Sequence, residues 1–93
     1  MNTQAAPLVF ITGASSGIGQ ALAARFADTG YRLALVARRT AEIESWANAR
    51  GMGASSYRIN SADVGVIDSI VAAGADCLAT QGVPDVVIAN AGI

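Results

Sequence analysis

The glycine-rich segment at residues 12–19, Thr-Gly-Ala-Ser-Ser-Gly-Ile-Gly, constrains the fold of this chain more than any other feature. It follows the apolar run at residues 8–11 and leads into a segment with helical periodicity. A strand that ends in a glycine-rich turn and continues as a helix presents unpaired backbone N–H groups and a positive helix end. We therefore predict that this turn binds phosphate.

The three glycines of the turn have separate predicted roles. Gly13 allows the tight turn, Gly17 lets a pyrophosphate approach the backbone, and Gly19 lets the helix pack closely on the strand. The segment is not an ATP-binding P-loop, because the Gly-Lys-Ser/Thr ending is missing and the chain has no lysine. Three glycines at this spacing after a buried-type strand favour a dinucleotide site over an ordinary Gly/Ser loop.

Strand and helix patterns alternate along the 93 residues. Strands are predicted at residues 8–12, 32–37, 55–60 and 85–89, and helices at about 17–29, 40–51 and 67–81. Short connections between alternating elements imply right-handed crossovers and a parallel sheet. The sequence predicts the α/β class, as a partial Rossmann-type doubly wound sheet with strand order 3-2-1-4 and the polar third strand at an edge.

Helical periodicity also predicts which side chains are buried. In the first helix the apolar stripe contains Ile18, Leu22 and Phe26. Thr40 is expected to cap the second helix. Cys77 is expected to be a small apolar residue of the third helix. The apolar face of that helix is expected to contain Ile67, Ile70, Val71, Ala75 and Leu78.

Composition excludes several classes of function. The formal net charge is −1 and the six arginines are spread along the chain, so no basic face for nucleic acid is expected. No apolar run approaches the roughly 18 residues of a membrane span, and the N-terminus has no basic stretch typical of a signal peptide. The chain has no histidine, which excludes histidine acid–base chemistry and the usual zinc sites within it. A single cysteine suits a reducing cytoplasm.

Two arginines, Arg38 and Arg39, follow the predicted second strand, and no acid lies between Asp28 and Glu42. In dinucleotide-binding folds an acid near this position bonds the ribose 2′-OH of NAD, whereas arginine accommodates the 2′-phosphate of NADP. The position therefore favours NADP, with NAD as the weaker candidate. The alternative is that both arginines are simply solvated at the start of a helix.

Asp63 and Val64 follow the predicted third strand at the same sheet edge. The carboxylate can accept a hydrogen bond from the exocyclic amine of adenine, and the valine can cover the ring. The competing interpretation is that Asp63 caps the third helix.

Together with Asn90-Ala91-Gly92-Ile93, these motifs resemble those of the short-chain dehydrogenase/reductase family, in family order and with the glycine spacing of its compact members. The resemblance covers nearly the whole chain and implies NAD(P)-dependent hydride transfer on an alcohol or carbonyl substrate, in a protein expected to be a homo-oligomer. Arg38 and Arg39 would hold the 2′-phosphate, and Asp63 and Val64 the adenine. The pyrophosphate and its ribose would contact Gly13, Ser15, Ser16, Gly17, Ile18 and Gly19, and the ribose and nicotinamide side would be lined by Asn90, Ala91 and Gly92.

The family's catalytic serine, tyrosine and lysine have no counterpart here. Tyr31 and Tyr57 are followed four residues later by Leu35 and Ser61, where the family has lysine. We therefore expect residues 1–93 to be the NAD(P)-binding N-terminal portion of a longer domain and to be inactive alone. Two alternatives stay open: a non-catalytic NADP-binding sensor, and a truncated fragment that binds nothing.

Overall fold

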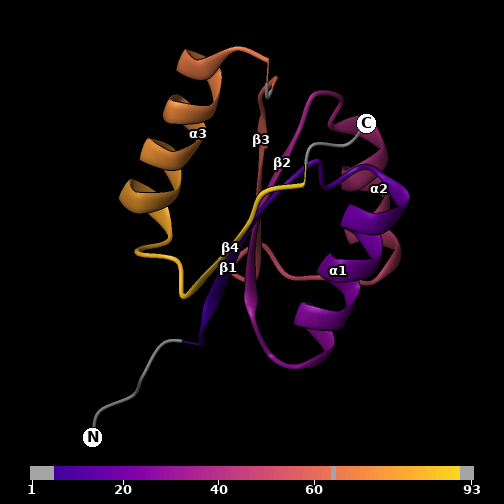
Figure 1. The fold of residues 1–93 in the computed structure, drawn as a ribbon. Helices are drawn as coiled ribbons and strands as arrows, with labels where there is room; N and C mark the ends of the chain where they lie inside the picture. Colours follow the sequence, from indigo (N-terminus) through magenta and orange to yellow (C-terminus); the bar gives the residue numbers. More distant parts are fainter. Residues whose placement is uncertain (1–5, 64, 91–93) are drawn as a thin grey trace, which may run out of the picture.

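The computed structural model describes residues 6–63 and 65–90. Its elements alternate as expected: β1 (Leu8–Thr12), α1 (Gly17–Asp28), β2 (Arg32–Ala37), α2 (Ala41–Ala49), β3 (Tyr57–Ser61), α3 (Ile67–Thr80) and β4 (Val86–Ile88). The strands form one parallel sheet in the order β3-β2-β1-β4. Helices α1 and α2 cover one face of the sheet and α3 covers the other (Figure 1). The predicted fold class and strand order are confirmed.

Two strand boundaries differ from the prediction. β3 begins at Tyr57, two residues later than expected, and β4 is three residues long. Asp85 lies just before β4 because its side chain takes part in the pairing with β1. The Leu8 amide donates to Asp85 Oδ2 at 2.9 Å, while the Asp85 amide donates to the Leu8 carbonyl at 2.8 Å.

The larger hydrophobic cluster lies between the sheet and helices α1 and α2. Because side chains alternate along a strand, β1 and β2 send every second residue to this face. The fully buried members are aliphatic or alanine: Val9, Ile11, Ala14, Ala23, Leu33, Leu35 and Ile43. Leu22 and Phe26 of α1 pack against them, as predicted.

The cluster beneath α3 is built from smaller residues. Its largest side chains are those of Leu8, Phe10 and Val36. The remaining buried members are small: Ala34, Ala62, Ala73 and Cys77. Cys77 is 1% exposed, and burial raises the pKa of its thiol. This confirms the expectation that Cys77 packs as a small apolar residue.

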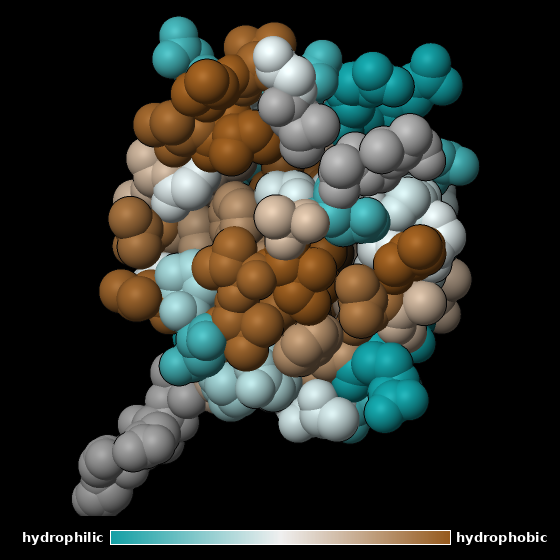
Figure 2. Space-filling view, viewed as in Figure 1, coloured by the Kyte–Doolittle hydropathy of each residue, from teal (hydrophilic) through white to brown (hydrophobic). Residues whose placement is uncertain are grey.

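The apolar face predicted for α3 is wrong. The helix buries Ala73 and Cys77, and of the predicted stripe only Ile70 packs against the core. Ala75 is exposed, and Ile67, Val71 and Leu78 are 77%, 62% and 57% exposed. The helix is apolar around most of its circumference, so periodicity alone did not distinguish its two sides. The hydrophobic surface over α3 and the neighbouring β4 is visible in Figure 2.

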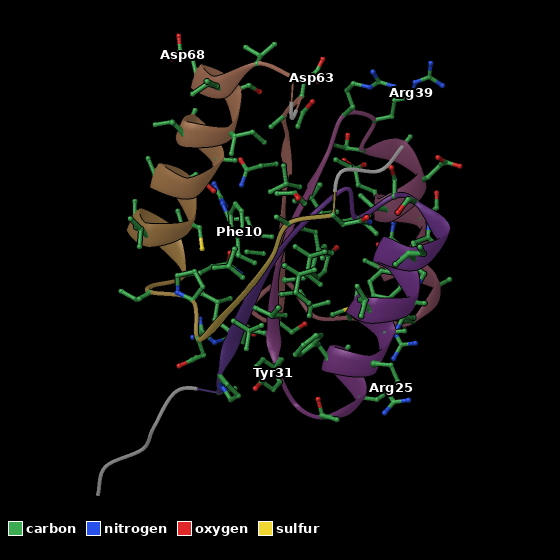
Figure 3. The ribbon with its side chains drawn as sticks, viewed as in Figure 1. Phe10, Arg25, Tyr31, Arg39, Asp63 and Asp68 are labelled. Carbon is green, nitrogen blue, oxygen red and sulfur yellow. The ribbon has the colours of Figure 1, made fainter. Side chains whose placement is uncertain are left out.

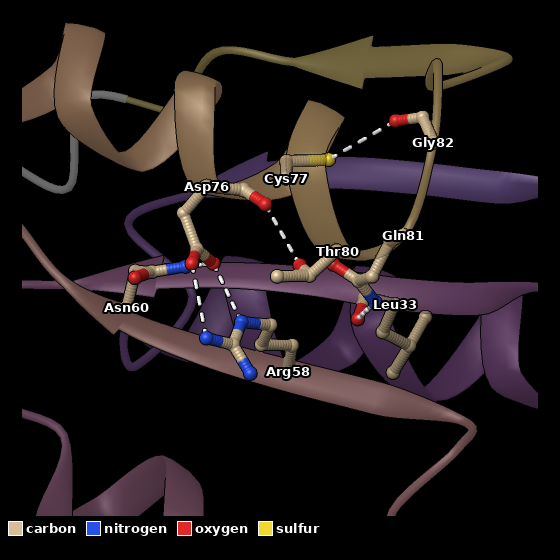
Figure 4. A network of polar contacts seen from close by, with 8 residues as sticks. All are labelled: Leu33, Arg58, Asn60, Asp76, Cys77, Thr80, Gln81 and Gly82. Carbon is tan, nitrogen blue, oxygen red and sulfur yellow. Dashed lines mark hydrogen bonds and ion pairs between the residues drawn. The ribbon is translucent and has the colours of Figure 1, made fainter.

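A polar network ties α3 to the edge strand β3 (Figure 4). The Arg58 guanidinium donates to both carboxylate oxygens of Asp76, at 2.6 and 3.0 Å, and Asn60 Nδ2 donates to the same carboxylate at 2.8 Å. The hydrogen bonds from Arg58 and Asn60 lower the pKa of Asp76. A bidentate ion pair, rather than hydrophobic packing, therefore joins α3 to the edge strand β3.

Thr40 occupies the N-cap position of α2 but does not cap it in the predicted way. Its backbone is helical, at φ −95° and ψ −16°, and its side chain makes no capping hydrogen bond. A capping side chain requires an extended backbone at this position, which Thr40 lacks. Among the described residues, none of the helices combines the length and apolarity needed to cross a bilayer.

Candidate functional site

The loops that carry the candidate site leave the carboxyl ends of β1, β2 and β4. In the parallel register Thr12 pairs with Val36 and Ile11 with Ile88. Residues 13–19, 38–39 and 90 therefore emerge at one edge of the sheet. Figure 3 shows Arg39 and Asp63 at this edge, with Tyr31 and Arg25 at the opposite end.

The glycine-rich turn is tightly packed at two of its glycines. Gly13 has a φ of +64°, and a Cβ there would lie 2.4 Å from the Asn90 carbonyl oxygen. A Cβ on Gly19 would lie 2.1 Å from the Gly13 carbonyl oxygen. Any side chain at either position would force the backbone apart. By contrast, a Cβ on Gly17 would meet no atom within 4 Å, so Gly17 faces open space.

The turn presents unpaired N–H groups at the start of α1. Ser16 is the N-cap residue, and its Oγ accepts a hydrogen bond from the Gly19 amide at 3.0 Å. Within the described part of the chain, the amides of Ser15, Gly17 and Ile18 have no hydrogen-bond partner. These three donors and the positive end of the α1 dipole can hold an anion.

Ile18 differs from its predicted packing. The residue is 70% exposed. Ile18 lies in the first turn of α1, at the carboxyl ends of the strands, whereas Leu22 and Phe26 lie further along the helix, where it packs on the sheet. The apolar stripe predicted for this helix is therefore correct at Leu22 and Phe26 but wrong at Ile18. The Ile18 side chain is instead available beside the turn.

Asn90 lies two residues past β4 and makes hydrogen bonds to the end of β1 and to the glycine turn. Its backbone N–H donates to Thr12 Oγ1 at 3.0 Å, and Thr12 Oγ1 donates to the Asn90 carbonyl at 3.3 Å. The Asn90 side-chain amide donates to Ser16 Oγ at 2.9 Å and to the Gly13 carbonyl at 3.3 Å. Four hydrogen bonds thus join Asn90 to the end of β1 and the glycine turn: three connect a side chain with the main chain, and one connects the Asn90 and Ser16 side chains.

Arg38 and Arg39 follow β2 at the same edge, and both are exposed. The ion pairs among the described residues involve Arg50 with Asp28 and Arg58 with Asp76, so neither Arg38 nor Arg39 has a carboxylate partner there. The Arg38 main chain is held because its carbonyl accepts from Ser61 Oγ at 3.3 Å. Both guanidinium groups remain available to an anion.

Asp63 does not cap α3, so that interpretation of the residue is wrong. The N-cap of α3 is Val66, which makes no side-chain capping bond. Asp63 Oδ1 instead accepts from the Gly65 amide at 2.9 Å, within the turn that precedes the helix. Val64, Ala91 and Gly92, the other candidates on these two loops, lie outside the described residues.

Residues 7–93 match the short chain dehydrogenase family. The chain belongs to the short-chain dehydrogenase/reductase family. It is 37% identical over 89 residues to an uncharacterized oxidoreductase of Mycobacterium bovis. The aligned segment covers 91% of this chain and 26% of that protein. The chain thus spans about a quarter of that relative's length.

Solved structures of family members share the fold. An alcohol dehydrogenase from Thermococcus sibiricus complexed with 5-hydroxy-NADP has a TM-score of 0.80 and 33% identity, over 89% of this chain and 36% of that one. A 3-ketoacyl-(acyl-carrier-protein) reductase from Brucella melitensis complexed with NADH has a TM-score of 0.76 and 31% identity, over 87% and 32%. The first of these structures contains an NADP derivative, and the second contains NADH.

Sequence reasoning missed one part of this short-chain dehydrogenase/reductase site, which is the hydroxyl link from Thr12 and Ser16 to Asn90. Its only signals in the sequence are a threonine at the end of β1 and an asparagine just past β4. Once the order 3-2-1-4 is assumed, these positions become neighbours, but their hydrogen bonds depend on side-chain geometry.

An open hollow of about 460 Å³ lies away from this site, at the other end of the sheet. It is lined by Tyr31, Arg32, Arg50 and Met52, among others. Arg32 Nε donates to the Ala6 carbonyl, and its NH1 donates to the Gln81 carbonyl. These contacts secure the start of β2.

Proposed function

We propose that this chain is the cofactor-binding part of an NADP-dependent oxidoreductase that transfers hydride between nicotinamide and an alcohol or carbonyl substrate. The observation that carries the proposal is a convergence at one sheet edge. Among residues 6–63 and 65–90, three amides of the glycine turn have no hydrogen-bond partner, and they lie there together with two arginines that have no carboxylate partner in the same residues. A dinucleotide with an extra phosphate needs both features.

Each part of the cofactor has a candidate partner. The turn containing Gly13, Ser15, Ser16, Gly17, Ile18 and Gly19 holds the pyrophosphate. Arg38 and Arg39 pair with the 2′-phosphate, and Asp63 and Val64 contact the adenine. Asn90, Ala91 and Gly92 are the residues that we propose to line the ribose and nicotinamide side. The open space at Gly17 and the N–H groups beside it suit a phosphate, since no atom of the described residues competes for them.

The preference for NADP over NAD depends on charge. A guanidinium offers a permanent charge and paired donors to a phosphate, whereas the 2′-OH of NAD gains most from an acid, which this strand end lacks. The structural neighbours include complexes with both kinds of cofactor, so the proposal depends on the arginines of this chain.

Isothermal titration of the chain with NADP⁺ and with NAD⁺ tests this preference. We expect NADP⁺ to bind at least about tenfold more tightly, as one charge-assisted phosphate contact contributes roughly 1.5–3 kcal/mol. Arg38→Asp should remove the preference and leave NAD⁺ binding nearly unchanged. Arg25→Asp, at the opposite end of α1, is the matched control. Equal affinity for both cofactors in the unmodified chain would contradict the assignment.

We infer that hydride transfer requires further residues, because the catalytic serine, tyrosine and lysine implied by the family resemblance have no counterpart in residues 1–93. When bound, NADPH supplies the hydride, while the chain's own residues bind and orient the cofactor. With no lysine in residues 1–93, we propose that the catalytic serine, tyrosine and lysine lie in the rest of the protein. Assaying the whole protein for NADPH oxidation with carbonyl substrates distinguishes an enzyme from the second candidate, an NADP-binding sensor, which binds the cofactor without turnover.

The proposal extends to assembly and location. Exposed apolar side chains on α3 and β4, including Val71 and Val87, support a homo-oligomer. The free, buried Cys77 is compatible with a reducing cytoplasm. Sedimentation velocity at several concentrations tests the assembly, and a concentration-independent monomer of the whole protein would contradict it.

A further inference from the structure

The Ser16 hydroxyl has no hydrogen-bonding capacity left for a ligand. A hydroxyl donates one hydrogen bond and accepts two. Ser16 Oγ donates to the Gly13 carbonyl at 2.9 Å and accepts from the Gly19 amide at 3.0 Å and from Asn90 Nδ2 at 2.9 Å. All three bonds lie within the chain, so a phosphate could reach this hydroxyl only by breaking one of them.

The orientation of the Asn90 side chain follows from the same contacts. Its nitrogen lies 3.3 Å from the Gly13 carbonyl oxygen, which offers lone pairs and no hydrogen. The Asn90 NH₂ group must therefore face this carbonyl, and its second hydrogen is directed to Ser16 Oγ. The end of β4 thus determines the position of the group that caps α1.

The neighbouring Ser15 differs in this respect. Ser15 is half-buried, and among residues 6–63 and 65–90 its hydroxyl has no hydrogen-bond partner. Its carbonyl accepts from Gln20 Nε2 at 3.4 Å, whereas its amide and its hydroxyl make no hydrogen bond to a described residue. Within the described part of the chain, the Ser15 hydroxyl thus makes no hydrogen bond, whereas the hydroxyl of the adjacent Ser16 makes three.

We propose that Ser16 and Asn90 are positioning residues that act through each other. The Asn90 amide holds the Ser16 hydroxyl, which holds the Gly19 amide and the Gly13 carbonyl, and this sets the shape of the phosphate turn. Ser15, rather than Ser16, then supplies the side-chain hydroxyl to the cofactor. The inference rests on the proposed function for its ligand, and it makes the affinity of the turn depend on the end of β4.

A double-mutant cycle on NADP⁺ affinity tests this coupling. Ser16→Ala removes three hydrogen bonds and Asn90→Ala removes two. We expect NADP⁺ binding to weaken about fivefold in Ser16→Ala and about tenfold in Asn90→Ala. Because each residue acts through the other, the double variant should lose only about tenfold. A loss of about fiftyfold, the product of the two single effects, would overturn the proposal, because it would mean independent contacts with the cofactor.

Matched variants separate the link from a general loss of stability. Ser16→Thr retains a hydroxyl and should restore affinity to within about twofold. Ser56→Ala removes another hydroxyl that donates to a glycine carbonyl three residues earlier, at 2.7 Å, and should leave affinity unchanged. Ser15→Ala should weaken binding without lowering the free energy of unfolding. Failure of Ser16→Thr to rescue a folded chain would count against the link.

Hydrogen exchange of the Gly19 amide provides a reading that needs no cofactor. Asn90 does not bond Gly19, yet Asn90→Ala should accelerate exchange there, since Ser16 loses its orientation. Asn60→Ala, which removes an asparagine bonded to Asp76, should not. If the unmodified chain binds no NADP⁺, the proposed function fails, and unchanged Gly19 exchange in Asn90→Ala overturns the link separately.

Discussion

The two faces of the sheet are held in different ways. On the α1–α2 face, β1 and β2 bury large aliphatic side chains such as Ile11 and Leu35, which are fully shielded from solvent. On the α3 face the helix contributes mainly Ala73 and Cys77, and its contact with β3 is the polar link from Arg58 to Asp76. Leu78 and Val87 on this side remain exposed.

The difference teaches where stability and binding reside. The closed face carries α1, whose N-terminus forms the phosphate turn, so the candidate site rests on the better-packed half of the molecule. Parallel sheets are normally covered on both faces. The α3 face is only partly covered by the described residues, and we expect its exposed side chains to contribute little to the stability of this chain.

Matched leucine substitutions should separate the two faces most strongly. Leu35→Ala empties a fully buried position on the α1–α2 face and should cost about 2–5 kcal/mol in the free energy of unfolding. Leu78→Ala on α3 removes a side chain that is 57% exposed and should change it by about 0.5 kcal/mol or less. Urea denaturation of both variants measures the contrast, and similar losses would refute it.

Replacing a glycine by alanine should destabilise the chain on the α1–α2 face and stabilise it on the α3 face. Gly19→Ala places a Cβ against the Gly13 carbonyl, and such overpacking should destabilise the chain by about 1–3 kcal/mol. Gly74→Ala in α3 meets no atom within 4 Å and should stabilise it by about 0.5–1 kcal/mol through helix propensity. Thermal melts monitored by circular dichroism would show the difference. Destabilisation by Gly74→Ala would mean that the α3 face is more closely packed than described.

Acid should weaken the α3 face first. The pKa of Asp76 is lowered in the folded chain, so its charged form stabilises folding above the ordinary carboxyl pKa and this contribution disappears as pH falls through the lowered value. Asp76→Asn should destabilise the chain at pH 7, and the difference from the unmodified chain should shrink below about pH 4. Unfolding measured from pH 7 to pH 3 checks this. A difference that stays constant with pH would show that the charge of Asp76 is not involved.

Much of the fold could be predicted because periodicity and glycine spacing are local signals. The order 3-2-1-4 follows from alternation and crossover handedness, and this order brings Gly13 and Asn90 together. The buried side of α3 could not be predicted, because that helix is apolar on several sides and packing selects among them. Three other features could not be predicted: Thr40 does not cap α2, Asp63 bonds within its own turn, and the Ser16 hydroxyl makes three hydrogen bonds inside the chain. These features depend on backbone angles and side-chain partners that residue type does not determine.

The most direct measurement of the central claim is amide chemical-shift mapping of the chain titrated with NADP⁺. We predict the largest shifts at Ser15, Gly17 and Ile18, with further shifts at Arg38, all at the carboxyl ends of the strands. Tyr31 and Ser56, in the hollow at the opposite end, should not shift. Shifts centred on that hollow, with the glycine turn unchanged, would contradict the account.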